Sequence, residues 1–372
     1  MGQGIAEDIQ IRMVIPGDVF AADETNYSIK TLNPGEKKIY DFSFFTNKRF
    51  SADVLNITAK ISEKYAKYAK DKNMSVKMEE DISKAIALTI ESNTTNETIK
   101  IDRFSLTSHI DKDIPTKSKV PNRFALVIGN EDYKSKQSTL SSEQNVDYAV
   151  NDASIFKKYC LNTLGVQEDN MFFLTDATAG QMSQEIDLIT KLVNKVGSKA
   201  ELIVYYAGHG YPDELTKVPY LIPVDVSAAN NLSSSAIKLD WLYQQLANTN
   251  ASKITVFLDA CFTGGGRSSG LVASRGVTVK PKEGSLSGNL VVFSASSAEQ
   301  SSLPYHDEGH GMFTYFLLKK FQESKGSFTL GELSQYLDDN VSIQSLRVNQ
   351  KEQDPIVNIS DNVINDWRNW KF

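Results

Sequence analysis

The sequence predicts an α/β domain with a mainly parallel sheet flanked by helices, preceded by a small all-β, sandwich-like domain. In the first hundred residues, apolar side chains alternate with polar ones, which is the period of a half-buried strand. After residue 122, continuous apolar runs alternate with helical stripes, which is typical of parallel strands covered on both faces. Residues 111–122 are polar and contain two prolines, which indicates a linker. We therefore expect domains at residues 1–115 and 122–372.

The composition excludes several classes of protein. The 372 residues are 41% hydrophobic and 23% charged, with a net charge of −6, and this acidic balance disfavours nucleic acid as a partner. Cys160 and Cys261 are the only cysteines and the four histidines are scattered, so we expect no disulfide framework and no metal cluster. No apolar run approaches the length of a membrane span.

The first residues carry neither a basic region nor an apolar region of a signal peptide. If Met1 is the native start, we expect a cytoplasmic protein. If a signal peptide has been removed, we expect an exported one.

The elements of the first domain follow from alternating side chains. Strands are predicted where apolar residues occupy every second position, namely at Leu55–Ile61, Met74–Met78 and Ile99–Ile101. Residues 62–71, rich in Lys and Tyr, fit either a helix or a hairpin arm. No catalytic grouping is present, so a supporting or interaction module is the favoured interpretation.

The elements of the second domain alternate between strand and helix. The predicted strands are the apolar runs 124–128, 171–174, 202–206, 254–258 and 290–293. The predicted helices are 146–160, 182–196, 241–246, 311–321 and 330–341. Pro355–Val357 is predicted as a last edge strand, because an edge tolerates proline.

Two predicted strands end in residues that can carry chemistry. One continues into Gly208-His209-Gly210 and the other into Asp259-Ala260-Cys261. Since active sites lie at the carboxyl ends of parallel strands, neighbouring strands would bring His209 and Cys261 together. The imidazole could then take the thiol proton and activate the thiolate for acyl transfer. Taken singly, such a cysteine is more often a buried hydrophobe, and such a histidine a surface residue.

These motifs resemble caspase-like cysteine peptidases, most closely bacterial metacaspase-like proteins and the metacaspases and paracaspases. The motifs Y-Y-A-G-H-G and L-D-A-C-F-T-G resemble the family's His and Cys motifs. R-F-A-L-V-I-G-N-E-D-Y, N-D-A, V-V-F-S-A-S-S-A-E-Q and G-H-G-M-F-T-Y-F-L-L match further landmarks. The resemblance covers about residues 122–359 and leaves out the first domain.

The resemblance implies a role for each site residue. Cys261 would be the nucleophile and form a thioester, with His209 as general base and acid. The backbone N–H groups of Gly210 and Cys261 would form the oxyanion hole. No third orienting side chain stands out, and such enzymes often use a backbone carbonyl instead.

The resemblance also implies a P1 pocket for a cation. It places Asp152 and Asp259 in that pocket, where two carboxylates would attract Arg or Lys. Ser294 and Ser296 would line the pocket and pair with the substrate backbone. Each of these four residues also has an ordinary structural alternative, such as a cap or a strand-end hydrogen bond. Ala207 stands where many metacaspases have Ser, which removes one pocket contact.

Three further expectations concern regulation and the remaining histidines. The Gly/Ser-rich loop 264–289 occupies the family's processing site, so autocleavage is predicted after one of its basic residues, which are Arg267, Arg275, Lys280 and Lys282. Arg275 and Lys280 are favoured.

Calcium activation stays an open alternative. Asp213, Glu214 and Asp225 match no calcium loop, so ordinary solvated carboxylates are the favoured interpretation of these residues. His306 and His310 are expected in surface or loop roles rather than catalysis.

The sequence therefore predicts a cysteine endopeptidase that cleaves protein or peptide substrates after Arg or Lys and needs no cofactor. The rival from another class is a catalytically silent caspase-like scaffold that binds partners. A second rival is a peptidase with a small or acidic P1 residue. The oligomeric state, pathway and activating signal are not predicted.

Overall fold

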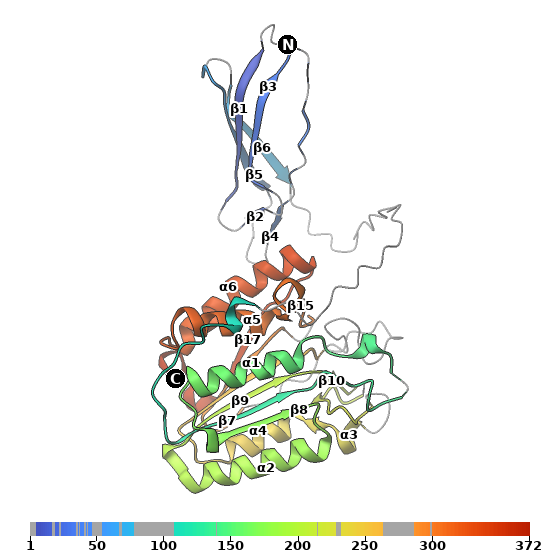
Figure 1. Ribbon diagram of the computed structural model, residues 1–372, viewed down its shortest axis with the longest axis vertical. Coiled ribbons are helices and arrows are strands. Elements are labelled where there is room, and N and C mark those ends of the chain that lie inside the picture. Colours follow the sequence, from blue (N-terminus) through green and yellow to red (C-terminus); the bar gives the residue numbers. More distant parts are fainter. Residues whose placement is uncertain are drawn as a thin grey trace. The chain divides into compact units, whose positions relative to one another are not determined.

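The computed structural model divides into two compact units, Met1–Ile101 and Asp102–Phe372 (Figure 1). It describes the chain except residues 1–4, 17–18, 22–23, 35, 37, 41, 43, 47–53, 67–68, 78–107, 139, 214, 228–231, 263–285 and 298–299. The predicted strand at Ile99–Ile101 lies outside the described residues, as does Met78.

The first unit is built on one antiparallel sheet, whose strand order is β3-β1-β5-β6. Its strands are β1 (Ala6–Val14), β3 (Asn26–Leu32), β5 (Val54–Ser62) and β6 (Lys72–Lys77). A second, two-stranded ribbon pairs β2 (Val19–Ala21) with β4 (Phe44–Thr46). The small apolar cluster of this unit consists of Val19, Leu55 and Ile57. The prediction of an antiparallel all-β unit is confirmed, and residues 62–71 lie in the β5–β6 hairpin.

The second unit contains the predicted α/β fold. Its six-stranded sheet has the order β17-β14-β13-β9-β7-β8, and all neighbouring pairs are parallel except the β17–β14 edge. The strands are β7 (Arg123–Gly129), β8 (Met171–Thr175), β9 (Glu201–Ala207), β13 (Lys253–Asp259), β14 (Leu290–Ser294) and β17 (Ile356–Ile359). Small accessory strands are β10 (Gly210–Pro212), β11 (Pro219–Leu221), β12 (Ile237–Lys238), β15 (Pro304–Tyr305) and β16 (His310–Gly311).

Helices cover both faces of this sheet (Figure 1). One face carries α1 (Ala149–Asn162), α5 (Met312–Glu323) and α6 (Leu330–Asn349). The other carries α2 (Ala179–Val196) and α4 (Leu239–Ala247), and the short α3 (Leu232–Ser235) lies in the connection before α4. Of the helices in the described part of the chain, none has the length and apolar character needed to cross a membrane.

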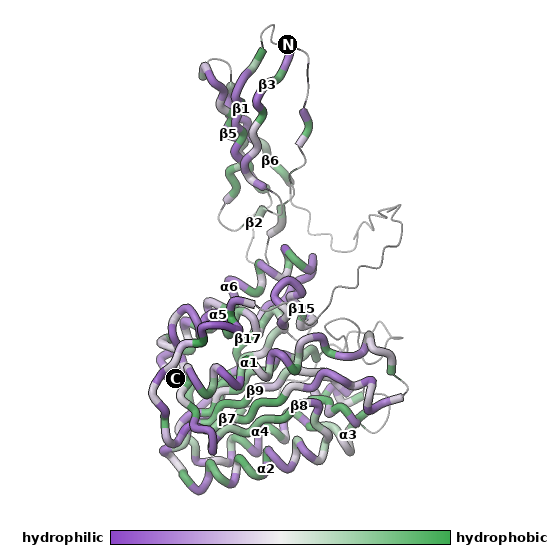
Figure 2. Tube along the Cα trace, in the orientation of Figure 1, coloured by the Kyte–Doolittle hydropathy of each residue, from purple (hydrophilic) through white to green (hydrophobic). Residues whose placement is uncertain are grey.

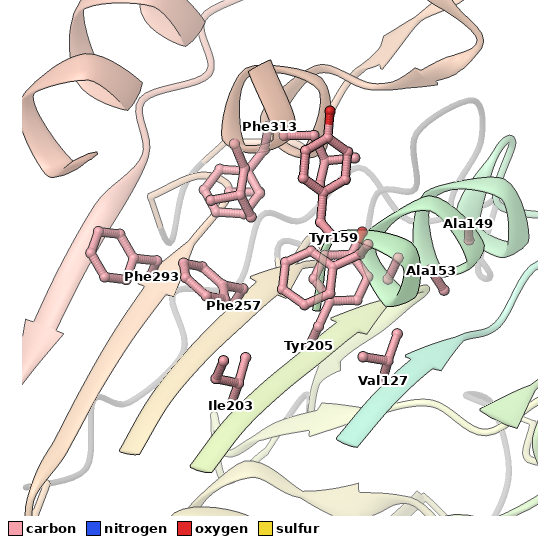
Figure 3. Close-up of a cluster of buried hydrophobic side chains, with 14 of the residues drawn as sticks. Val127, Ala149, Ala153, Tyr159, Ile203, Tyr205, Phe257, Phe293 and Phe313 are labelled. Atoms are coloured by element: carbon pink, nitrogen blue, oxygen red, sulfur yellow. The ribbon is translucent and has the colours of Figure 1, made fainter. Parts of the chain in front are cut away.

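The central strands have mostly apolar residues in their interiors because both of their faces are buried. In β7, Ala125 and Val127 pack into the cluster under α1, whereas Leu126 and Ile128 pack into the cluster under α2. Figure 2 shows hydrophobic runs within β7 and β9. On the α1 side, Tyr205, Phe257 and Phe293 project from three neighbouring strands toward α1 and α5 (Figure 3). This rigid sheet fixes the ends of β9 and β13.

Two boundaries differ from the sequence prediction for physical reasons. The helix predicted from Val146 begins at Ala149, because Tyr148 has a φ of 69°, which no α-helix accommodates. The predicted linker 111–122 is bonded to the second unit. Lys117 donates from its backbone N–H to Asn162 O (2.7 Å), and Val120 donates to Gly165 O (2.7 Å).

Candidate active site

The register of two parallel strands brings the histidine loop and the cysteine loop together. Ala207, the last residue of β9, pairs with Asp259, the last residue of β13. His209 and Cys261 each follow their strand's last residue by two positions. Their loops also touch, because a Cβ added at Gly210 would lie 2.7 Å from the Phe262 ring and 2.8 Å from the Cys261 carbonyl oxygen. Only a glycine permits this approach.

His209 is held by main-chain and aromatic partners. Its Nε2 lies 2.7 Å from the carbonyl oxygen of Gln144, an acceptor, so Nε2 must carry the proton and Nδ1 is the basic nitrogen of the neutral ring. The Tyr133 ring packs against the imidazole at 4.6 Å between centroids, and the Tyr133 hydroxyl accepts the His209 N–H at 2.9 Å. Tyr206 donates to the His209 carbonyl at 2.8 Å.

Sequence reasoning identified none of these three partners. A backbone carbonyl such as that of Gln144 has no sequence signature, although the resemblance did suggest one in this role. Tyr133 belongs to the quoted segment R-F-A-L-V-I-G-N-E-D-Y, so its place in a family landmark was the available signal.

Cys261 is buried, with 3% of its surface exposed. Its thiol donates to the carbonyl oxygen of Gln300 (3.5 Å), which also accepts a hydrogen bond from the Ser296 hydroxyl (3.1 Å). The Gln300 side chain is fixed in turn by Asp354, to which it donates at 2.7 Å and from whose N–H it accepts at 2.8 Å. In this conformation the Gln300 carbonyl lies against the thiol.

The other cysteine has a different environment. Cys160 lies on the core-facing side of α1 and is fully buried, and this burial raises the pKa of its thiol. A thiol with a raised pKa is a poor nucleophile.

Asp259 is fully buried behind the cysteine loop. It accepts hydrogen bonds from the Ser302 hydroxyl, from the Thr314 hydroxyl at 2.6 Å and from the Thr314 N–H at 3.3 Å. Ser294, the last residue of β14, is also buried and pairs with Leu258 of the neighbouring strand.

Asp152, on the first turn of α1, is likewise fully buried. Its Oδ1 lies 2.7 Å from His310 Nδ1, and its carboxylate accepts the N–H of Gly311 at 3.0 Å. The second ring nitrogen of His310 lies 2.9 Å from Asp111. Burial by itself lowers the pKa of His310, but the hydrogen bonds and charges of Asp111 and Asp152 outweigh it and raise that pKa to about 9.

The expectation of a surface or loop role for His310 is therefore wrong. Its side chain is completely buried, because two carboxylates supply the partners that a buried imidazolium needs. His306 is exposed as expected and bonds to the Tyr148 hydroxyl at 2.9 Å.

Both predicted pocket carboxylates lie at the N-terminus of α5. Asp152 binds the N–H of Gly311, the residue that caps the helix, and Asp259 binds the N–H of Thr314 in its first turn. A helix N-terminus is a favourable place for a carboxylate, because its unpaired N–H groups and its dipole attract negative charge. The structure thus gathers Asp152 and Asp259 around one helix end, and it gives each of them partners within the protein.

The remaining predicted site residues lie apart from this arrangement or outside the described chain. Asp213 accepts hydrogen bonds from Thr216, and Asp225 accepts the N–H of Ala179 at the start of α2. In the described part of the chain, no group of His, Cys, Asp and Glu is arranged to hold a metal ion. Residues outside the described chain include Glu214 and the autocleavage candidates Arg267, Arg275, Lys280 and Lys282.

The fold and the two strand-end loops define a caspase-type α/β domain. A family model described as the caspase domain, peptidase C14, matches residues 122–363. The chain belongs to this family of cysteine peptidases.

Among solved structures, the protein GSU0716 of Geobacter sulfurreducens is similar, with 16% sequence identity and a TM-score of 0.46 over 64% of this chain and 94% of that chain. Caspase-1 of Spodoptera frugiperda is also similar, with 15% identity and a TM-score of 0.44 over 65% of this chain and 88% of that chain. No curated protein matches the sequence.

Proposed function

We propose that the chain is a cysteine endopeptidase that cleaves after Arg or Lys with His209 and Cys261 as its catalytic residues. One observation carries the proposal: the β9–β13 register sets these two residues at the same level of adjacent strand ends. The Gln144 carbonyl supports it, since a proton fixed on Nε2 leaves Nδ1 as the base.

The proposed reaction has two steps. His209 Nδ1 takes the proton of Cys261, the thiolate attacks the scissile carbonyl carbon, and the N–H groups of Gly210 and Cys261 stabilise the oxyanion. The imidazolium then returns its proton to the leaving amine as the C–N bond breaks, which leaves a thioester on Cys261. In the second step His209 deprotonates water, which attacks the thioester and releases the acid and the thiol.

Substrate binding has to displace the Gln300 carbonyl from Cys261. The thiol hydrogen bond to Gln300 O must break before the thiolate can attack, so the described conformation represents a resting state. An extended substrate beside Ser294 and Ser296 would replace this contact.

Preference for Arg or Lys is proposed from the two carboxylates at the α5 N-terminus. Asp152 and Asp259 both accept N–H groups within one turn of that helix end, and Asp259 precedes Cys261 by two residues in sequence. A P1 cation would therefore meet negative charge in a site from which water is largely excluded, which favours it over Asp or Glu. Self-processing in loop 264–289 follows from the same preference, because this loop holds four basic residues.

A panel of fluorogenic peptides that differ only at P1 tests the proposal, with wild type and Cys261→Ala, each with calcium and with a chelator. We expect cleavage after Arg and Lys by wild type alone, and no cofactor requirement. Cleavage after Asp or after small residues would overturn the pocket assignment. Absence of cleavage of every peptide under both conditions would favour the scaffold, a role that the covered thiol would also suit.

A further inference from the structure

A buried chain of three residues connects the proposed P1 pocket to a segment that precedes the family domain. It consists of Asp111, His310 and Asp152, and we call it the Asp–His–Asp bridge. The imidazole lies 2.9 Å from Asp111 and 2.7 Å from Asp152. Asp152 and His310 are fully buried, and the Asp111 side chain is 10% exposed.

The segment that carries Asp111 is firmly packed on the second unit. Ile110 is fully buried in its core, and the Ile110 carbonyl accepts a hydrogen bond from the Tyr159 hydroxyl at 2.8 Å. The Ser108 hydroxyl donates to Glu308 at 2.5 Å. These contacts fix Asp111 beside His310, although the caspase-domain match begins only at residue 122.

The geometry of the bridge sets its charge. Carboxylate oxygens only accept hydrogen bonds, so an imidazole with a carboxylate at each nitrogen carries both protons and a positive charge. His310 therefore neutralises one of its two carboxylates, and the bridge as a whole keeps one negative charge. Without the Asp111 charge, the negative charge of Asp152 and the positive charge of His310 would cancel.

We propose that Asp111 and His310 are positioning residues that set the negative charge of the P1 pocket, with Asp111 supplying the charge that His310 removes from Asp152. This inference rests on the proposed Arg/Lys preference and extends it to a residue outside the family domain. The ligand class is the cationic P1 side chain of a peptide substrate.

The test compares Asp111→Asn with Asp113→Asn, because Asp113 is an exposed residue of the same segment and its change removes the same charge. Each variant is assayed at pH 6 with paired peptides that carry either arginine or its neutral isostere citrulline at P1. For Asp111→Asn we expect KM for the arginine peptide to rise on the order of tenfold, with kcat and the citrulline reaction little changed. Asp113→Asn should match wild type.

A second measurement needs no variant and covers the case in which Asp111→Asn does not fold. Asp111 and Asp152 are the charged groups that act on His310, and Tyr305 is its partner across the β15–β16 pair, where burial raises the tyrosine pKa and favours the neutral form. Raising the pH of wild type from 7 to 9.5 at constant salt should increase the arginine-to-citrulline ratio of kcat/KM, because His310 loses its positive charge while arginine keeps its own.

The outcomes separate this inference from the proposed function. A wild-type protein that cleaves no Arg or Lys peptide overturns both the P1 preference and the inference. A wild type that cleaves arginine peptides, with an unchanged arginine-to-citrulline ratio in Asp111→Asn or an equal loss in Asp113→Asn, overturns the inference alone. If Asp111→Asn does not fold, the wild-type pH series decides. An arginine-to-citrulline ratio of kcat/KM that stays constant or falls as the pH rises overturns the inference.

Discussion

Replacing His310 by glutamine should remove a pH-dependent part of the stability of the second unit. The folded protein raises the pKa of His310 from 6.5 to about 9. A group whose pKa is higher in the folded than in the unfolded state stabilises the fold fully below the unfolded value, and this contribution is lost as the pH rises through the folded value. The loss therefore falls between pH 6.5 and pH 9.

The magnitude follows from the two pKa values. The difference between 6.5 and about 9, at about 1.4 kcal/mol for each pH unit, corresponds to about 3 kcal/mol. Burial of both ring nitrogens against Asp111 and Asp152 keeps solvent screening small, so most of this value should be measurable.

Denaturant unfolding followed by fluorescence at pH 6, 7.5 and 9.5 measures the effect. The stability advantage of wild type over His310→Gln should shrink by about 3 kcal/mol across this range. His306→Gln is the matched control, because His306 is exposed and should give a constant difference. Parallel pH profiles for wild type and His310→Gln would refute the argument that two carboxylates hold His310 protonated.

Four further predictions concern the site. Gly210→Ala should lower kcat/KM by about 10²-fold, because its Cβ would push Cys261 and Phe262 out of place, whereas Gly180→Ala, which meets open space on α2, should leave the peptide assay unchanged. Tyr133→Phe should lower kcat about tenfold with little change in KM, since it removes the hydroxyl that accepts the His209 N–H and donates to the Ile222 carbonyl; equal activity in a steady-state assay would contradict this. Iodoacetamide followed by peptide mass mapping should modify Cys261 and leave Cys160 intact, because burial raises the Cys160 pKa; preferential labelling of Cys160 would reverse the assignment. On a denaturing gel, wild type should be cut within loop 264–289. The chain should stay intact in Cys261→Ala and in a variant with glutamine at all four basic positions, Arg267, Arg275, Lys280 and Lys282. An uncut wild type that cleaves Arg peptides would disprove self-processing.

Local sequence pattern was enough to predict most of the second unit. The inner strands β7, β9, β13 and β14 bury both faces, so their apolar runs are long and easily recognised, and all four are confirmed. The run at 171–174 is confirmed as well, as the partly buried edge strand β8. The edge strand β17 was predicted because an edge accepts Pro355 nearby. Strand β1 was not predicted, although its residues Ile9, Ile11 and Met13 alternate with polar ones in the same period as the apolar residues of β5.

The site was predictable only where its residues sit in recognisable local motifs. His209 and Cys261 each follow a strand directly, so the chain's own pattern predicts that their loops lie together, and the β9–β13 register brings those two loops side by side. The Asp–His–Asp bridge has no such signal, because His310 is 158 residues from Asp152 and 199 from Asp111 in sequence. Only the packing of α1, α5 and the segment at Ile110 brings them together.

Active-site labelling with peptidyl acyloxymethyl ketones tests the central claim most directly, that Cys261 and His209 act as a peptidase pair with a basic P1 preference. Probes with arginine, citrulline and aspartate at P1 would be compared on wild type, His209→Ala and Cys160→Ala by intact mass and peptide mapping. The account predicts one adduct, on Cys261, formed fastest by the arginine probe, unchanged in Cys160→Ala and lost in His209→Ala. Equal labelling by the aspartate probe, an adduct on Cys160, or labelling that persists in His209→Ala would contradict it.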